Sequence, residues 1–123
     1  MNHPANQAAA IMQRSAPERL IQSAITDYLG YTGWLVVETS QPWRVANGLV
    51  GVPDVIAWKA FGLHSVTLFV EVKTVRGKLR ASQVEFMERL RPLLCPTLWH
   101  CVARSVDDVI EMVDVIARAN KEI

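Results

Sequence analysis

The sequence predicts an α/β domain whose elements follow the order α-β-β-β-α-β-α. Three segments repeat apolar residues with helical spacing, and four short segments are rich in β-branched and aromatic residues. Of the 123 residues, 50% are hydrophobic and 20% are charged, which suits one core and excludes a disordered chain. No uncharged apolar run approaches the roughly 20 residues that span a bilayer, so a membrane-spanning class is excluded.

The first helix is expected over residues 16–29. Ser15 and Glu18 form a capping-box pattern, with Pro17 in the first turn, where its missing N–H group costs nothing. Gly30 suits the C-terminal cap. The apolar positions recur every three or four residues and are Leu20, Ile21, Ala24, Ile25, Tyr28 and Leu29.

Strands are predicted from short runs of β-branched and aromatic residues. These runs are 34–38, 54–59, 66–73 and 98–104. A turn-rich loop at 40–53 leads into the second strand, and 61–64 is a short hairpin-like connection. Side chains alternate along a strand, so one face of the third strand is wholly apolar. Its residues are Val66, Leu68, Val70 and Val72. We therefore expect this strand to be central and covered by a helix.

The second and third helices each begin with a polar capping pattern. Ser82 and Glu85 open the second helix, and Pro92 is expected to kink or end it. Its inward stripe is Phe86, Met87, Leu90 and Leu94. Ser105 and Asp108 open the third helix. The buried stripe of that helix is Val106, Val109, Ile110, Val113 and Ile116.

The net charge of +1 conceals a basic middle third of the chain. Residues 40–84 carry six basic side chains against two acidic ones. The basic residues are Arg44, Lys59, Lys73, Arg76, Lys78 and Arg80. A local basic patch attracts a polyanion such as nucleic acid even when the whole chain is nearly neutral. The alternative is an ordinary solvated basic turn.

The two acids of this middle third, Asp54 and Glu71, are expected on neighbouring strands together with Lys73. Such charges are costly beside apolar neighbours unless something pairs them. Mg²⁺ resolves the repulsion, because it takes one or two carboxylates plus waters and phosphate oxygens. A lysine beside it orients or deprotonates an attacking water, or offsets charge on the phosphate. The alternatives are a plain turn at Asp54 and an exposed ion pair between Glu71 and Lys73.

Two further polar residues near helix N-termini lean toward the apolar stripes. Glu18 precedes Ile21 and Ile25 by three and seven residues, and Gln83 precedes Phe86 by three. Both are expected to converge on the acidic pair. Alternatively, Glu18 is only the cap partner of its helix and Gln83 only a surface residue.

The ordered set of Glu18, Gly51-Val52-Pro53-Asp54, Glu71-Val72-Lys73 and Ser82-Gln83 resembles the PD-(D/E)XK nuclease superfamily. More narrowly, it resembles the virus-type replication-repair nuclease (VRR-NUC) family in its standalone, phage-like form. The resemblance covers about residues 15–105. It implies a restriction-endonuclease-like core with a central mixed sheet, dependence on Mg²⁺ or Mn²⁺, and cleavage of DNA phosphodiesters.

The resemblance also implies a role for each matching position. Asp54 and Glu71 would be catalytic metal ligands, with the backbone carbonyl of Val72 as a third ligand. Lys73 would be the catalytic lysine. Glu18 would assist metal binding, and Gln83 would orient the site. The expected DNA contacts, from the basic middle third, are Arg44, Arg76, Lys78 and Arg80.

The resulting expectation is a metal-dependent DNA endonuclease that is selective for branched DNA, like Holliday-junction resolvases, and acts as a homodimer. An alternative is a non-catalytic DNA-binding or regulatory module that retains the fold. A third possibility is a small protein whose ion pairs are purely structural. We expect one domain over residues 15–123 after a flexible lead-in at 1–14.

The chain is expected in the cytoplasm, or in the host cytoplasm if it is phage-encoded, because no secretory signal is recognised. Cys95 and Cys101 are too few for a disulfide framework and are expected to be reduced core thiols. A zinc site with His100 is disfavoured, because no second cysteine pair is present. Trp43 has two interpretations, stacking on an unpaired base or closing the core.

Overall fold

The computed structural model describes residues 17–39 and 51–121. Its helices are α2 (Glu18–Tyr31), α3 (Ala81–Leu90) and α4 (Val106–Asn120), with a 3-10 turn, η1 (Arg91–Leu93). Its strands are β1 (Leu35–Glu38), β2 (Val55–Phe61), β3 (His64–Val72) and β4 (Leu98–Ala103). The predicted order of elements is therefore confirmed. The lead-in at 1–14, Ser15, Trp43 and Arg44 lie outside the described residues. In the described ranges, no helix has the length and apolar character needed to cross a membrane.

The four strands form one mixed sheet in the order β1-β2-β3-β4. The first three strands are antiparallel neighbours, whereas β3 and β4 are parallel. The segment that contains α3 returns the chain to the edge of the sheet where β3 begins, so β4 starts beside the start of β3. The register pairs Val55 with Val70 and Val72 with Ala103. As predicted, β3 is a central strand.

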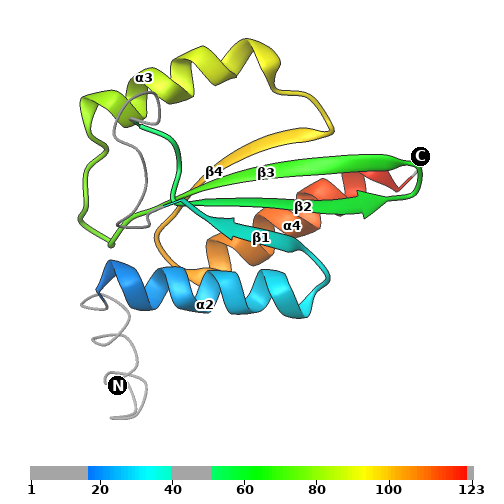
Figure 1. Cartoon of the computed structure of the whole chain (residues 1–123), viewed down its shortest axis with the longest axis horizontal. Helices are drawn as coiled ribbons and strands as arrows, with labels where there is room; N and C mark the ends of the chain where they lie inside the picture. Colours follow the sequence, from blue (N-terminus) through cyan, green and yellow to red (C-terminus); the bar gives the residue numbers. More distant parts are fainter. Residues whose placement is uncertain (1–16, 40–50, 122–123) are drawn as a thin grey trace, which may run out of the picture.

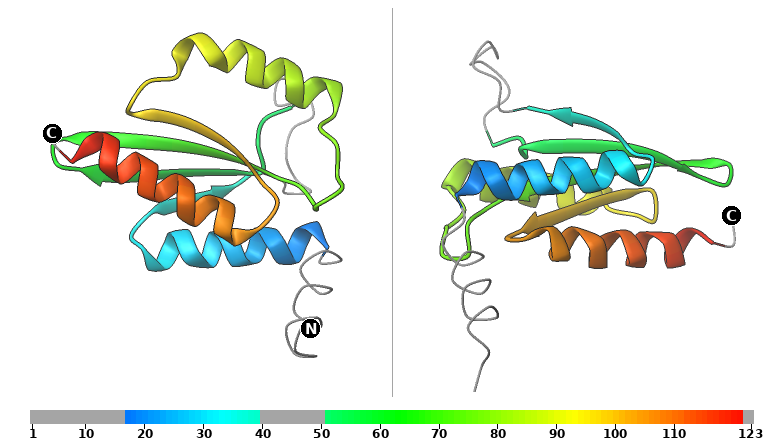
Figure 2. Two further views of the ribbon diagram at one scale, coloured as in Figure 1. Left: turned by 180° about the vertical axis from the view of Figure 1, so that it is seen from behind. Right: turned by 90° about the horizontal axis from the view of Figure 1, so that it is seen from below.

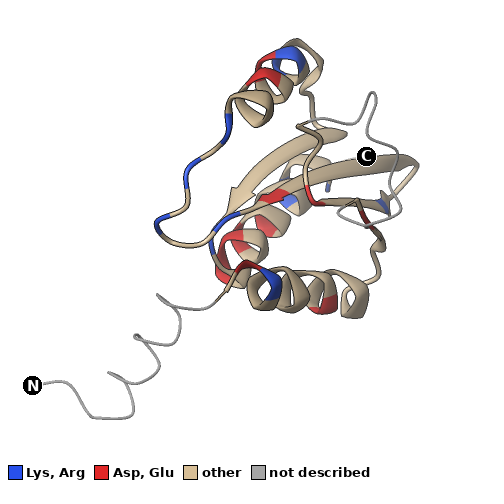
Figure 3. Ribbon diagram, turned by 60° about the vertical axis from the view of Figure 1, so that its left-hand side comes forward, with Lys and Arg blue, Asp and Glu red and all other residues tan. Residues whose placement is uncertain are grey.

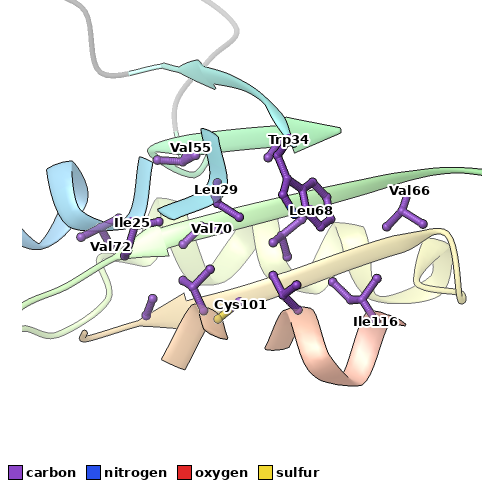
Figure 4. Close-up of a cluster of buried hydrophobic side chains, with 14 of the residues drawn as sticks. Ile25, Leu29, Trp34, Val55, Val66, Leu68, Val70, Val72, Cys101 and Ile116 are labelled. Carbon is purple, nitrogen blue, oxygen red and sulfur yellow. The ribbon is translucent and has the colours of Figure 1, made fainter. Parts of the chain in front are cut away.

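The sheet lies between two layers of helices, with α2 and α4 on one face and α3 on the other (Figures 1 and 2). The core fills the α2/α4 side, where the predicted apolar face of β3 is fully buried (Figure 4). Ile25 and Leu29 come from α2, and Val109 and Ile116 from α4. On the opposite face, Phe69 of β3 meets Phe86 of α3 edge to face, with ring centroids 5.8 Å apart.

The first helix is displaced by two residues from its predicted range of 16–29. It begins at Glu18 with Pro17 as the N-cap, a position that suits a residue with fixed φ and no N–H group. It continues through Gly30 to Tyr31. The chain turns at Gly33, whose φ of 93° favours glycine.

The second helix begins at Ala81 with Arg80 as its N-cap, so the predicted capping box of Ser82 and Glu85 is wrong. The Arg80 N–H donates to Oε1 of Gln83 over 2.7 Å, which places the capping side chain at Gln83 instead. The helix ends at Leu90 and Pro92 lies in η1, as expected for proline.

Two residues predicted to be buried after this helix are instead exposed. Leu94 is exposed, because α3 ends at Leu90 and Leu94 lies on the connection from η1 to β4 rather than on a helix face. Cys95 is also exposed, whereas Cys101 is buried in the core, and neither forms a disulfide. The interpretation as core thiols therefore holds only for Cys101.

Several strand ends differ from the sequence-based ranges. Strands β2 and β3 extend into their hairpin until Phe61 pairs with His64. Asp54 lies just before β2, and Lys73 just after β3, so neither is a strand residue. The last strand ends at Ala103, one residue early. Trp34 is buried just before β1 and meets Phe61 edge to face.

The two glycines at positions 30 and 51 are expected to respond oppositely to substitution by alanine. Gly51 has a φ of +83°, and a Cβ there would collide with the Ser82 carbonyl oxygen. Gly51→Ala should therefore lower the free energy of unfolding by roughly 2–4 kcal/mol. Gly30 lies in a helix with no atom near its Cβ position, so Gly30→Ala should raise it by roughly 0.5–1 kcal/mol. Urea denaturation of both variants measures the difference; equal stabilities would contradict the close contact of Gly51 with α3.

Candidate active site

The residues singled out from the sequence meet at the end of the central strand β3. Asp54 precedes β2 by one residue, and the pairing of Val55 with Val70 brings it beside the end of β3. Glu71 is on β3, Lys73 follows that strand, and Gln83 lies in the first turn of α3. Three separate segments therefore supply the four side chains.

Asp54 is held from both its side chain and its backbone. Its Oδ2 accepts a hydrogen bond of 2.9 Å from the Val72 N–H. Its carbonyl accepts one of 2.9 Å from the Thr39 N–H, and the Thr39 hydroxyl donates to the Pro53 carbonyl over 2.6 Å. Sequence reasoning did not single out Thr39, because these contacts cross 14 or 15 positions and leave no local pattern.

Gln83 connects the start of α3 to the carboxyl group of Glu71. Its Nε2 donates to Oε1 of Glu71 over 2.6 Å, while its own Oε1 accepts the Arg80 N–H. One side chain thus caps the helix and binds the buried acid. This double contact explains why Gln83, rather than Ser82, closes the cap.

Glu71 is almost completely buried, with 2% of its surface exposed. Burial is the main cause that raises the pKa of Glu71 from 4.5 to about 8, and Asp54 adds to it by its charge and a hydrogen bond. The charge of Glu18 raises this pKa further, whereas the ammonium of Lys73 lowers it. Glu18 is therefore close enough to act on the pair, and at neutral pH Glu71 retains its proton when no cation is bound.

Lys73 is also buried, with 5% of its surface exposed. Its backbone N–H donates to the Ala103 carbonyl over 3.0 Å, which fixes the backbone of Lys73 to the end of β4. Its ammonium makes no hydrogen bond to any residue that the structure describes, and it acts on Glu71 through its charge. An ammonium held in place by a buried side chain, without such a partner, is well suited to interact with a bound substrate or water.

The acidic pair fits a hard divalent cation. A buried carboxyl group and a half-buried one side by side need either a proton or a cation between them, and Mg²⁺ takes one or two carboxylates with waters completing its shell. The N–H and C=O groups of a strand residue lie on the same edge, so the Val72 carbonyl faces Asp54 as its N–H does. Within the described ranges, no three His, Cys, Asp or Glu side chains gather closely enough to hold a metal ion.

The predicted DNA contacts lie beside this cluster. Arg76, Lys78 and Arg80 are exposed on the connection between β3 and α3, where Figure 3 shows basic positions along the chain. Arg44 lies outside the described residues.

A mixed four-stranded sheet between helices on both faces is a restriction-endonuclease-like core. The family model of the VRR-NUC domain matches residues 6–96, and the chain belongs to this family, as its motifs predicted. Its function is therefore that of a nuclease-family domain that processes DNA. The match includes Asp54, Glu71, Lys73 and Gln83 and ends before β4. No curated protein sequence matches the chain.

Burial of Glu71 should make the metal-free protein less stable as pH rises. A carboxyl group whose pKa is raised in the folded state stabilises that state below pH 4.5, and this contribution is lost as pH rises toward about 8. Glu71→Gln keeps the shape and cannot ionise, so it should remove most of this slope and be more stable than wild type above pH 8 by roughly 4 kcal/mol.

Urea denaturation in EDTA between pH 5 and 8.5 measures this effect. The matched control is Glu111→Gln on α4, where the carboxyl group is exposed. It should follow the wild-type profile. An unchanged slope in Glu71→Gln would contradict the buried, protonated state.

Proposed function

We propose that this protein is a metal-dependent DNA endonuclease that hydrolyses phosphodiester bonds. The observation that carries the proposal is the buried carboxyl group of Glu71, which meets Asp54, Lys73 and Gln83 at the end of β3. A purely structural protein gains nothing from such a costly group. A non-catalytic module would have no need to keep all of Asp54, Glu71 and Lys73.

Each of the four residues has a proposed role in the reaction. Asp54, Glu71 and the Val72 carbonyl would hold Mg²⁺ or Mn²⁺, with Glu18 assisting. A bound divalent cation supplies positive charge to the phosphate and lowers the pKa of a bound water. Lys73 orients the attacking water and offsets the charge that builds on the phosphate.

Gln83 keeps the Glu71 carboxylate in place through its 2.6 Å hydrogen bond. The water loses a proton to solvent as its oxygen forms a bond to phosphorus, the bond from phosphorus to the 3′ oxygen breaks, and the 3′ oxygen takes up a proton from solvent. The products are a 5′-phosphate and a 3′-hydroxyl. Arg76, Lys78 and Arg80 bind the DNA backbone, and we assign the same role to Arg44.

We further propose that the protein acts on branched DNA as a homodimer and resides in the cytoplasm, or in the host cytoplasm if it is phage-encoded. Leu35 and Val37 of the edge strand β1 are 67% and 44% exposed, which supports a second copy on this edge. Two active sites are needed to cut both strands of a four-way junction. The free thiols of Cys95 and Cys101 support a reducing compartment.

Sedimentation equilibrium at micromolar concentration should give about twice 13.8 kDa for the wild-type chain. Leu35→Arg places a charge on the exposed edge and should yield monomers. Val115→Arg on α4, on the other side of the sheet, should leave the dimer intact. A wild-type species of 13.8 kDa with and without junction DNA would overturn both the dimer and the resolution of junctions.

Cleavage should depend on Asp54 and Lys73 and on an added divalent cation. Asp54→Asn keeps the shape but removes a ligand charge, and Lys73→Ala removes the ammonium, so each should lower the cleavage rate by about 10²–10⁴-fold. The substrates are single-stranded, flapped, nicked and four-way-junction DNA, each with Mg²⁺, Mn²⁺ or EDTA. Junction DNA should be cleaved fastest.

Asp107→Asn, at an exposed position on α4, is the matched control and should cleave at the wild-type rate. Circular dichroism should show all three variants folded. Wild-type cleavage by Asp54→Asn or Lys73→Ala would refute the assigned site.

A further inference from the structure

Arg104 lies beside Lys73, at the ends of the two parallel strands. Val72 pairs with Ala103, and the Lys73 N–H donates to the Ala103 carbonyl over 3.0 Å. The residue that follows β3 is therefore Lys73, and the residue that follows β4 is Arg104. Arg104 lies outside residues 6–96, which the family model matches, and sequence reasoning did not single it out.

The guanidinium of Arg104 donates hydrogen bonds to the backbone carbonyls of the turn at residues 74–77, which follows Lys73. Its Nη1 donates to the carbonyls of Thr74 and Gly77 over 2.6 Å each, and a third carbonyl, that of Val75, lies at 3.3 Å. A charged donor makes hydrogen bonds about twice as strong as a neutral one. A single nitrogen therefore links the first and last residues of the turn, Thr74 and Gly77.

Arg104 is itself anchored, whereas the turn has little support of its own. The Arg104 N–H donates to Oδ2 of Asp108 over 2.8 Å, which ties it to the first turn of α4. Within the turn, the Gly77 N–H donates to the Thr74 carbonyl over 3.1 Å. No other described side chain donates to the carbonyls of this turn. The shape of the turn therefore depends on Arg104.

The turn is the start of the basic segment. Arg76, Lys78 and Arg80 follow one another at every second position, all exposed, and none forms a salt bridge to a described residue. Their charges are available to phosphates, and their distance from the active site is set by the turn that Arg104 holds.

We propose that Arg104 is a positioning residue for DNA, which fixes the basic segment relative to Lys73 without contacting DNA itself. The proposal rests on the proposed function, because it assigns the basic segment to the DNA backbone. It adds a residue from the connection between β4 and α4 to the machinery that the end of β3 provides. Preorganising cations in this way lowers the entropy lost when phosphates bind.

The first test examines the turn in the free protein. Hydrogen exchange of the amides at 74–80 should be clearly faster in Arg104→Met than in wild type, because the carbonyls lose their donor. Arg91→Met removes an exposed arginine that pairs with Glu88 and should leave this exchange unchanged. Wild-type exchange at 74–80 in a folded Arg104→Met would overturn the proposal.

The second test is a double-mutant cycle on DNA binding, measured in EDTA so that no cleavage occurs. The second arm of the cycle is the triple variant Arg76→Ala, Lys78→Ala and Arg80→Ala. Arg104→Met alone should weaken binding by roughly three- to tenfold, but should have no further effect in the triple variant. Arg91→Met is again the control.

The outcomes separate this proposal from the one on which it rests. Additive effects of Arg104→Met and the triple variant would mean that Arg104 contacts DNA itself and would overturn the positioning role alone. Wild-type binding and salt dependence in the triple variant would overturn the DNA-binding segment and the positioning role together. Both results are measured without cleavage, so neither depends on whether Asp54 and Lys73 are catalytic residues.

A second variant keeps the test valid if Arg104→Met does not fold. Arg104→Lys retains one charge and most of the side-chain volume, but its ammonium is on a shorter stem. It should fall between wild type and Arg104→Met in both exchange and binding. Wild-type exchange combined with weakened binding in Arg104→Lys would overturn the proposal.

Discussion

The buried carboxyl group of Glu71 determines how the elements around it are arranged. Removing such a group from water costs free energy unless polar partners surround it. Three segments supply these partners: Asp54 from the entrance of β2, Lys73 from the end of β3 and Gln83 from α3. The cap of α3 follows from the same requirement, because the amide that binds Glu71 also accepts the N–H group of Arg80.

The opposite face of β3 stabilises the strand that carries this group. Side chains alternate along a strand, so the residues between the polar ones point into the core. Val70 and Val72 are fully buried there, against α2 and α4. The apolar burial on one face thus offsets the cost of polar burial on the other. This division between core and site explains why a chain of 123 residues holds a buried acid and a buried lysine.

The end of the sheet also connects chemistry with DNA binding. The chain continues directly from Glu71 and Lys73 into the basic segment, and β4 ends beside it at Ala103, one residue before Arg104. The hydrogen bonds of Arg104 join the segment to α4 through Asp108. The helix and strand beyond the family match therefore support the part of the chain that we assign to the DNA backbone.

The sequence by itself determined the order of the elements and the buried face of β3, because strand alternation and helical spacing are local patterns. The meeting of Asp54, Glu71 and Lys73 was expected from their placement on neighbouring strands and from the family resemblance of their motifs, which the structure bears out. The tertiary structure decided the cap of α3, the exposure of Cys95 and the anchoring of the turn by Arg104. The hydrogen bonds from Arg104 to the turn cross 27 to 30 positions. Contacts at such separations leave no local signal in the sequence, because they exist only once the sheet has brought the strand ends together.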